Sequence, residues 1–202
     1  MSVDLALSRL LAFPEDTSAD EAIRDAVRRA PRSVREGVDA YFASVGDMDI
    51  MARQQAYVDV FDFDRRASLH LTAHTHGDRR DRGTRLIELK ARMREGGLEL
   101  TSSELPDHLA VLLELRALSP EIGARTLSEL RPPIECVRAR LHDSKSPYAH
   151  VLDAVCSTMS RLTRDERAAA ERLAAEGPPP GETVGLEPFA PPEVMPQEGV
   201  LR

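Results

Sequence analysis

Tryptophan is absent from this chain, and aromatic residues make up only 4% of its 202 residues. A hydrophobic core therefore has to be built mainly from Leu, Val and Ala side chains. Long apolar runs are missing as well. The longest, Leu109 to Leu113, has five residues, whereas a membrane-spanning helix needs about 18 or more. The composition predicts a globular protein that does not insert into a membrane.

Cysteine and an excess of basic charge are also lacking. Cys136 and Cys156 are the only cysteines and do not form a CxxC motif. The segment from Met1 to Phe13 has no basic start and does not resemble a signal peptide. Both observations favour a reducing cytoplasm, where the two thiols stay free and buried. The net charge of −7 argues against nucleic acid as a partner, because neutralising phosphates needs a basic face.

The C-terminal segment differs in composition from the rest. Residues 177–202 hold seven of the 14 prolines and four of the 11 glycines, with a net charge of −3. Proline removes backbone donors and glycine raises the entropy cost of ordering. We therefore predict a disordered Pro/Gly/Glu-rich tail at 177–202 after a helical domain at 1–176. Alternatively, Leu186, Phe189, Val194 and Met195 dock as an extended strip.

The body shows helical periodicity throughout. Leu86, Leu89 and Met93 share one helix face, and the apolar stripe from Ile122 to Leu141 predicts a long helix. Pro132–Pro133 falls inside that stripe, so a kink or break is expected there. The alternation Val58–Asp59–Val60 is too short for a strand and is interpreted as helix. We predict an all-α, single-domain bundle of about seven to nine helices, which excludes Rossmann, P-loop and α/β-hydrolase folds.

Helix boundaries are marked by capping sequences. Ser119–Pro120 and Ser146–Pro147 fit an N-cap residue followed by proline at the first helical position. Thr163 and Glu166 have the spacing of a capping box, in which each side chain bonds a backbone amide at the helix start.

A histidine-rich stretch is the first candidate for chemistry. His70, His74, His76 and Asp78 have spacings used by metal ligands, which suggests a metal-dependent hydrolase. The alternative is a helix that runs to about Thr75 and is ended by Gly77, with His74 and His76 bonding carbonyls of its last turn.

An arginine-rich stretch follows, between Gly77 and Gly83. One interpretation is a loop with local ion pairs before a helix from about Thr84. The second is a recognition surface for an acidic or phosphorylated ligand. A third is a guanine-nucleotide or cofactor site.

The second candidate segment runs from Glu104 to Leu109. Pro106 suits a helix start, and Asp107 in the first turn suits the positive end of the helix dipole. Asp107 and His108 fit either a hinge that presents both side chains to a partner or, alternatively, a general base pair.

Together these segments resemble one family, the nitrate reductase molybdenum cofactor assembly chaperones (the NarJ type, also called the delta subunit), within the redox-enzyme maturation chaperones. The first match comprises Tyr57, Val58, Phe61, Asp62, Arg65, Arg66, Ser68, Leu69, Leu71, Thr72, Thr75, His76, Gly77, Asp78, Arg79, Arg82 and Gly83. The second comprises Glu104, Leu105, Pro106, Asp107, His108, Leu109, Leu113, Glu114 and Leu115. The sequence departs from the family at Ala73–His74, where aromatic residues are usual.

The resemblance implies an all-α protein that is not an enzyme. It would bind the apo catalytic (alpha) subunit of a respiratory nitrate reductase, chiefly at its N-terminal segment. It would hold that subunit in the cytoplasm until bis-molybdopterin guanine dinucleotide is inserted, and so delay membrane docking. The chaperone would bind no cofactor permanently and would meet it only transiently, through the client. Monomer and dimer both remain open.

The resemblance also implies a peptide-binding site. Its candidate residues are Tyr57, Phe61, Asp62, Leu69, His76, Asp78, Arg79, Glu104, Pro106, Asp107 and His108. The aromatic and leucine side chains, with Leu71, would form an apolar floor, or alternatively plain core. The acidic side chains would meet basic residues of the client. Replacing Asp107 and His108 with alanine is expected to weaken client binding and leave the fold intact.

Overall fold

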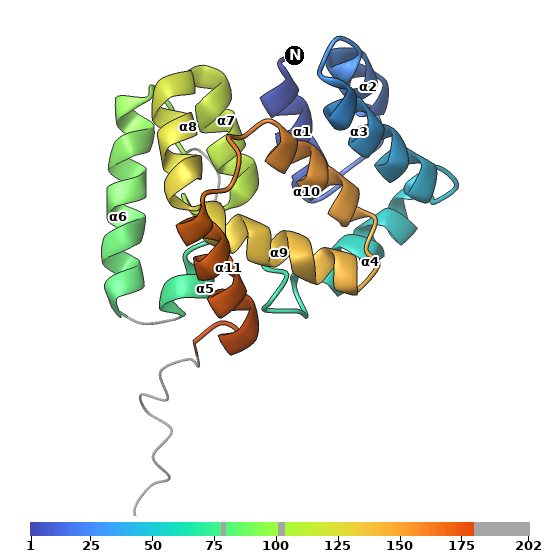
Figure 1. Ribbon diagram of the computed structural model, residues 1–202. Coiled ribbons are helices and arrows are strands. Elements are labelled where there is room, and N and C mark those ends of the chain that lie inside the picture. Colours follow the sequence, from blue (N-terminus) through green and yellow to red (C-terminus); the bar gives the residue numbers. More distant parts are fainter. Residues whose placement is uncertain (78–79, 101–103, 180–202) are drawn as a thin grey trace, which may run out of the picture.

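The computed structural model describes residues 1–77, 80–100 and 104–179, and these residues form eleven α-helices (Figure 1). The helices are α1 (Val3–Leu11), α2 (Asp20–Val27), α3 (Arg32–Val45), α4 (Ile50–Phe61), α5 (Ala73–His76), α6 (Arg80–Glu95), α7 (Leu109–Leu118), α8 (Pro120–Glu129), α9 (Arg131–Asp143), α10 (Tyr148–Ser157) and α11 (Arg164–Glu176). The predicted all-α class is confirmed. The number of helices exceeds seven to nine because short helices such as α5 are separate and one long predicted helix is divided.

The division of that long helix follows from its prolines. α8 ends at Glu129 and α9 begins at Arg131, with Leu130 between them. Pro132–Pro133 therefore occupies the first turn of α9. Backbone N–H groups in a first turn have no acceptor within the helix, so the prolines cost no helical hydrogen bond there. Ser119 and Pro120 stand at the expected N-cap and first position of α8. The capping box at the start of α11 is also confirmed.

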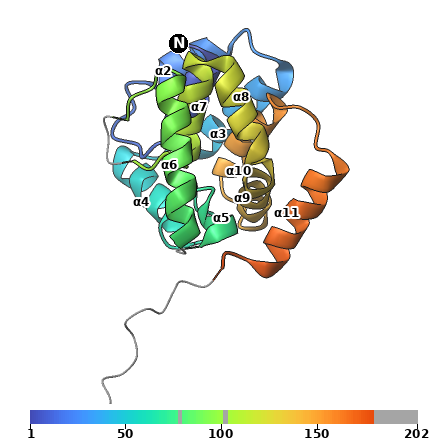
Figure 2. The ribbon, with the colours of Figure 1, turned by 90° about the vertical axis from the view of Figure 1, so that its left-hand side faces the viewer.

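The core runs through the middle of the helical bundle. α10 packs against α3, α9 and α1, and α1 packs against α7. α7 is buried nearly all round: Leu109, Leu112, Leu113 and Leu115 are all fully buried. In contrast, α6 and α11 lie at the outside of the molecule (Figures 1 and 2). Among the described helices, none has both the length and the apolar character needed to cross a bilayer.

Most of the described aromatic residues gather in one cluster, and the exposed Phe63 lies outside it. Tyr148 of α10 contacts Tyr41, Tyr57 and Phe61, with ring centroids 5.3, 5.8 and 4.8 Å away. The Tyr57 hydroxyl donates a hydrogen bond to the Leu11 carbonyl at 3.1 Å. The stretch around Val58 and Val60 is helical, as predicted, and forms part of α4. This cluster compensates for the scarcity of aromatics by concentrating them where α3, α4 and α10 meet.

Both cysteines are free and buried, as predicted. Burial raises the pKa of the Cys156 thiol to about 12, so the thiol stays protonated near neutral pH. The predicted tail falls largely on residues 180–202, which lie outside the described residues. The assignment of 177–202 as a tail therefore stays a prediction.

Candidate functional site

The two candidate segments meet through a short antiparallel bridge between His70 and His108. The Leu71 N–H donates to the Asp107 carbonyl at 3.1 Å, and the Leu109 N–H donates to the Leu69 carbonyl at 3.0 Å. These bonds fix the chain before α5 to the chain before α7. The bridge joins single residues and belongs to no strand among the described residues. The alternating pattern of a strand is therefore missing from the sequence, and periodicity did not reveal the bridge.

Asp107 lies at the centre of this junction and is fully buried. Its carboxylate accepts hydrogen bonds from the Thr72 N–H (3.2 Å), the Thr72 hydroxyl (2.5 Å) and the Arg82 guanidinium (3.3 Å). The His70 Nδ1 atom lies 3.3 Å away. Burial raises the pKa of Asp107, but the hydrogen bonds from His70 and Thr72 and the charges of His70 and Arg82 outweigh it and lower the pKa to about 2. Asp107 thus joins two segments and does not face the surface.

His108 is also buried, and it is the N-cap residue of α7. Its ring centroid lies 5.1 Å from that of His70. Burial lowers the pKa of His108 to about 4; Glu104 opposes this shift, and the neighbouring His70 adds to it. α7 begins at Leu109, so Pro106 and Asp107 precede the helix and do not form its first turn. Asp107 and His108 therefore do not present their side chains at an exposed hinge. We call Asp107 and its hydrogen-bond partners His70, Thr72 and Arg82 the clasp.

Acid is expected to destabilise the protein through this histidine. The pKa of His108 is about 4 in the folded protein against a usual 6.5, so the unfolded chain binds more protons between these values. Stability is therefore complete above pH 6.5 and falls by about 1 to 2 kcal/mol as the pH drops from 7 to 5. Burial shifts the pKa of His74 in the same direction.

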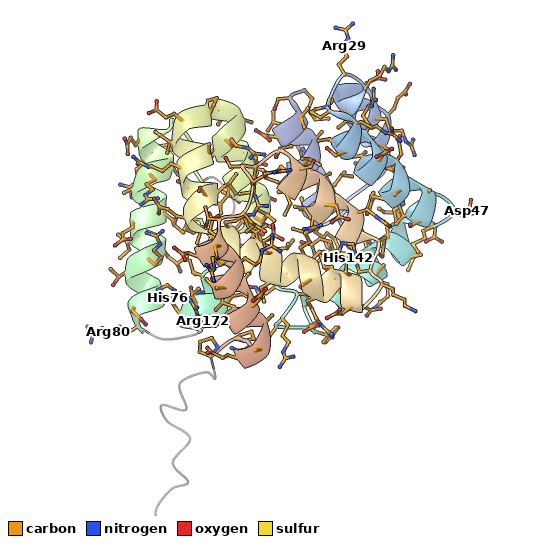
Figure 3. The ribbon with its side chains drawn as sticks, in the orientation of Figure 1. Arg29, Asp47, His76, Arg80, His142 and Arg172 are labelled. Atoms are coloured by element: carbon orange, nitrogen blue, oxygen red, sulfur yellow. The ribbon has the colours of Figure 1, made fainter. Side chains whose placement is uncertain are left out.

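Urea unfolding of wild type and His108→Gln at pH 7 and pH 5 measures this effect. The variant is expected to lose less stability on acidification than wild type. The same substitution at His142 of α9 controls for the removal of one histidine (Figure 3). An equal loss in wild type and His108→Gln would show that His108 is not the titrating group.

The histidine-rich stretch does not act as one group. His74 is buried and its Nε2 atom lies 2.8 Å from the Ser68 carbonyl, so it does not bond carbonyls of the last turn of α5 as one interpretation expected. His76 lies nearer the surface, with Nδ1 2.7 Å from the Thr75 hydroxyl. Within the described ranges, no three His, Cys, Asp or Glu side chains are grouped to hold a metal ion. Asp78 lies outside these ranges.

The glycine and arginine residues after His76 are placed differently from the expected loop. α5 ends at Gly77, as predicted, and Gly77 has the positive φ of 59° that favours glycine. α6 begins at Arg80 and not near Thr84, so Arg82 and Gly83 are helical. Arg82 donates hydrogen bonds to the Thr72 hydroxyl and the Asp107 carboxylate, and so attaches the first turn of α6 to the junction. Arg79 lies outside the described residues, as Asp78 does.

All four residues of the expected apolar floor are core residues. Tyr57, Phe61 and Leu69 are 8%, 7% and 2% exposed, and Pro106 is buried as well. A helical stripe cannot distinguish a floor open to a ligand from a stripe covered by another helix, because both show the same period. Leu71 is fully buried too.

The surface near these core residues is both acidic and apolar. Burial, together with the charges of Glu104 and Asp62, raises the pKa of the Tyr57 hydroxyl. Asp62 directly follows α4, and the Glu104 carboxylate lies 3.6 Å from the His70 Nε2 atom. Asp62 is exposed and Glu104 is partly exposed. Their neighbours Phe63 and Leu105 are 78% and 38% exposed. We call Asp62, Phe63, Glu104 and Leu105 the acidic patch.

Two members of the acidic patch, Phe63 and Leu105, are absent from the sequence-based candidates. Each is a large apolar residue next to an acidic one outside a helix, at positions that helical periodicity does not classify. That pairing is a signal in the sequence that could have identified both residues, and Leu105 also belongs to the second family match. The clasp at Asp107 positions Glu104 and Leu105, because the bridge holds the following residues against Leu69 and Leu71.

Known proteins provide an independent comparison. Residues 20–154, more than half of the chain, match the family model described as nitrate reductase delta subunit. The chain is 33% identical over 177 residues to the nitrate reductase molybdenum cofactor assembly chaperone NarJ of Escherichia coli K12, covering 84% of this chain and 74% of that protein. It is 28% identical over 163 residues to the probable NarJ chaperone of Bacillus subtilis 168, covering 78% and 88%.

A third relative matches a shorter part. The nitrate reductase-like protein NarX of Mycobacterium tuberculosis H37Rv is 40% identical over 111 residues, which cover 54% of this chain and 17% of that protein. The identity is thus higher over a shorter segment. The bridge, the clasp at Asp107 and the acidic patch all lie between residues 62 and 109, inside the range of the family match.

Proposed function

This chain belongs to the nitrate reductase delta subunit family, and on that premise we propose that it is an assembly chaperone for a respiratory nitrate reductase and not an enzyme. It binds the apo catalytic (alpha) subunit at its N-terminal segment in the cytoplasm. It holds that subunit competent for molybdenum cofactor insertion before the complex docks at the membrane. Bis-molybdopterin guanine dinucleotide meets the chaperone only through the client.

The observation that carries this proposal is the acidic patch held by a buried clasp. Asp107 uses its carboxylate oxygens for Thr72, His70 and Arg82, and these bonds fix the chain that leads from Glu104 into α7. A rigid support below an exposed amphipathic surface suits recognition, because less conformational entropy is lost when a partner binds.

The chemistry of the acidic patch indicates what kind of segment it receives. Asp62 and Glu104 attract basic side chains, and Phe63 and Leu105 offer apolar contact area. A short peptide that combines basic and apolar residues fits this surface. The N-terminal segment of a client that carries a twin-arginine-like leader has this composition.

The double variant Asp62→Lys with Phe63→Ser is expected to weaken binding of a peptide from the N-terminus of the cognate catalytic subunit about tenfold or more, through lost attraction and lost apolar contact. Both side chains are exposed, so the fold should be unaffected. Isothermal titration calorimetry at low and high salt measures the affinity and its electrostatic part.

Asp47 and Met48 provide a matched control. They too are an exposed acidic residue followed by an exposed apolar one, and Asp47 lies at the end of α3 far from α5 (Figure 3). Asp47→Lys with Met48→Ser should bind the peptide like wild type. Equal affinities for the two double variants would exclude the acidic patch as the binding surface. Lack of binding to wild type at millimolar peptide would count against the proposed function itself.

A further inference from the structure

A C-terminal element lies across the outside of the bundle. α11 packs against α9, and residues 177–179 continue past the segment before α5 (Figures 1 and 2). There Gly177 lies against the Arg66 guanidinium, and the Pro179 carbonyl lies near Gly77 and 3.5 Å from an Arg65 guanidinium nitrogen. We call residues 164–179 the strap. It ends on residues of the first family motif.

The strap is weakly attached. No residue of α11 is buried. Among the described residues, the side chains of α11 form hydrogen bonds only in the capping box, between Glu166 and Thr163. The end of the strap has one further bond, from the Arg65 guanidinium to the Pro179 carbonyl. α11 is held against α9 by contact through small side chains such as Ala169 and one leucine, Leu173, and by the attraction between Arg131 of α9 and Glu166. An element with so little buried area opens at a low free-energy cost.

α11 also does not fill the surface that it covers. A groove of about 330 Å³ remains between α11 and the body. Leu130 and Pro133 line it on one side and Ala169 and Leu173 on the other, and the charged residues Arg85, Glu129, Arg172 and Glu176 lie along it as well. Figure 3 shows His76 of α5 and Arg172 of α11 close together at this groove. A helix with larger apolar side chains at the position of Ala169 would bury more surface there than α11 does.

We propose that the face of α9 and α5 below the strap is a docking surface for an amphipathic helical segment of the client, and that the strap occupies it until the client displaces it. This rests on the proposed chaperone function. The occupant in the structure is itself an amphipathic helix with an alanine and leucine stripe, which defines what the surface accepts.

The docking surface is continuous with the acidic patch. The turn from Asp62 to Arg66 has Asp62 and Phe63 of the acidic patch at its start and Arg65 and Arg66, which contact the strap, at its end. A client segment bound to the acidic patch therefore approaches the end of the strap. A client helix on the face of α9 and α5 would occupy the place of the strap, so the fraction of molecules with a closed strap lowers the apparent client affinity.

Leu173→Glu places a charge in the groove and is expected to release the strap. The variant should bind the client peptide about three- to tenfold more tightly than wild type, because the competing strap is weakened. Ala174→Glu, which adds the same charge on the exposed side of α11, is the matched control and should bind like wild type. In the wild type, peptide binding should accelerate amide hydrogen exchange across residues 164–176.

The outcomes separate this proposal from the proposed function. Peptide binding that leaves exchange in α11 unchanged or slower, with Leu173→Glu binding no tighter than Ala174→Glu, overturns the strap and leaves the chaperone function standing. If no variant binds the peptide, the proposed function fails, and the dye 1-anilinonaphthalene-8-sulfonate tests the strap alone. Stronger dye fluorescence with Leu173→Glu than with Ala174→Glu then supports a covered apolar surface, and equal fluorescence overturns it.

Discussion

Replacing Asp107 with alanine is expected to lower the free energy of unfolding by about 3 to 5 kcal/mol, the usual cost of removing one partner from a buried ion pair. The carboxylate is fully buried, and its loss removes the acceptor of one hydrogen bond from Arg82 and of those from the Thr72 N–H and the Thr72 hydroxyl. The bridge between His70 and His108 loses its support at the same time. Urea unfolding followed by circular dichroism at pH 7 measures the loss.

Two further variants test the reason for this loss. Asp107→Asn keeps an acceptor oxygen and the size of the side chain, so it should lose less stability than Asp107→Ala. Asp62→Ala removes an exposed carboxylate and should change stability by no more than about 0.5 kcal/mol. A loss below about 1 kcal/mol for Asp107→Ala would contradict a structural role for this residue.

The contribution of the Asp107 carboxylate to the free energy of unfolding depends on pH in a defined direction. The pKa of Asp107 falls from 3.8 to about 2 on folding, so the folded state binds fewer protons than the unfolded chain in this range. The stabilisation is present above pH 3.8 and is lost as the pH falls toward 2. The loss caused by Asp107→Ala should therefore shrink in acid.

This geometry changes how an alanine double variant at Asp107 and His108 must be interpreted. The sequence-based expectation was weaker client binding with an intact fold. Because both side chains are buried, the double variant is now expected to be destabilised. Reduced client binding by it would not show that Asp107 or His108 contacts the client, and the exposed pair Asp62 and Phe63 is the better test.

Gly123→Ala is expected to destabilise the protein by about 3 kcal/mol. α7 and α8 cross at this glycine, and a Cβ atom there would lie 2.2 Å from the Arg116 Cα and 2.4 Å from the Arg116 N. These are backbone atoms, so no side-chain rotation relieves the clash. Moving α7 would disturb the fully buried Leu113 and Leu115. Differential scanning calorimetry should show a clearly lower Tm.

Gly83→Ala is the matched control, because Gly83 is also helical but has nothing within 4 Å of an added Cβ atom. Alanine there restricts the unfolded chain and suits a helix, so the variant should be more stable by about 0.5 to 1 kcal/mol. The two substitutions should thus shift Tm in opposite directions. Shifts of the same sign would contradict the close crossing of α7 and α8.

The sequence by itself determined the all-α class and several helix ends, although the predicted starts near Thr84 and at Ser146–Pro147 differ from those of α6 and α10. The apolar period, the capping box at Thr163 and Glu166, the Ser119–Pro120 start and the stop at Gly77 all depend on residues within one or two turns. The family resemblance likewise rests on short motifs, and the family match confirms it. Local interactions are sufficient for each of these conclusions.

Only the tertiary structure decided which motif residues face the surface. Tyr57 and Phe61 became core because α10 covers them, and Asp107 became a buried clasp because Thr72 and Arg82 reach it from distant parts of the chain. Phe63 stayed exposed although it is apolar. The helical period predicts on which face of its own helix a residue lies. Whether that face is buried depends on which other segment packs against it, and no local pattern encodes that contact.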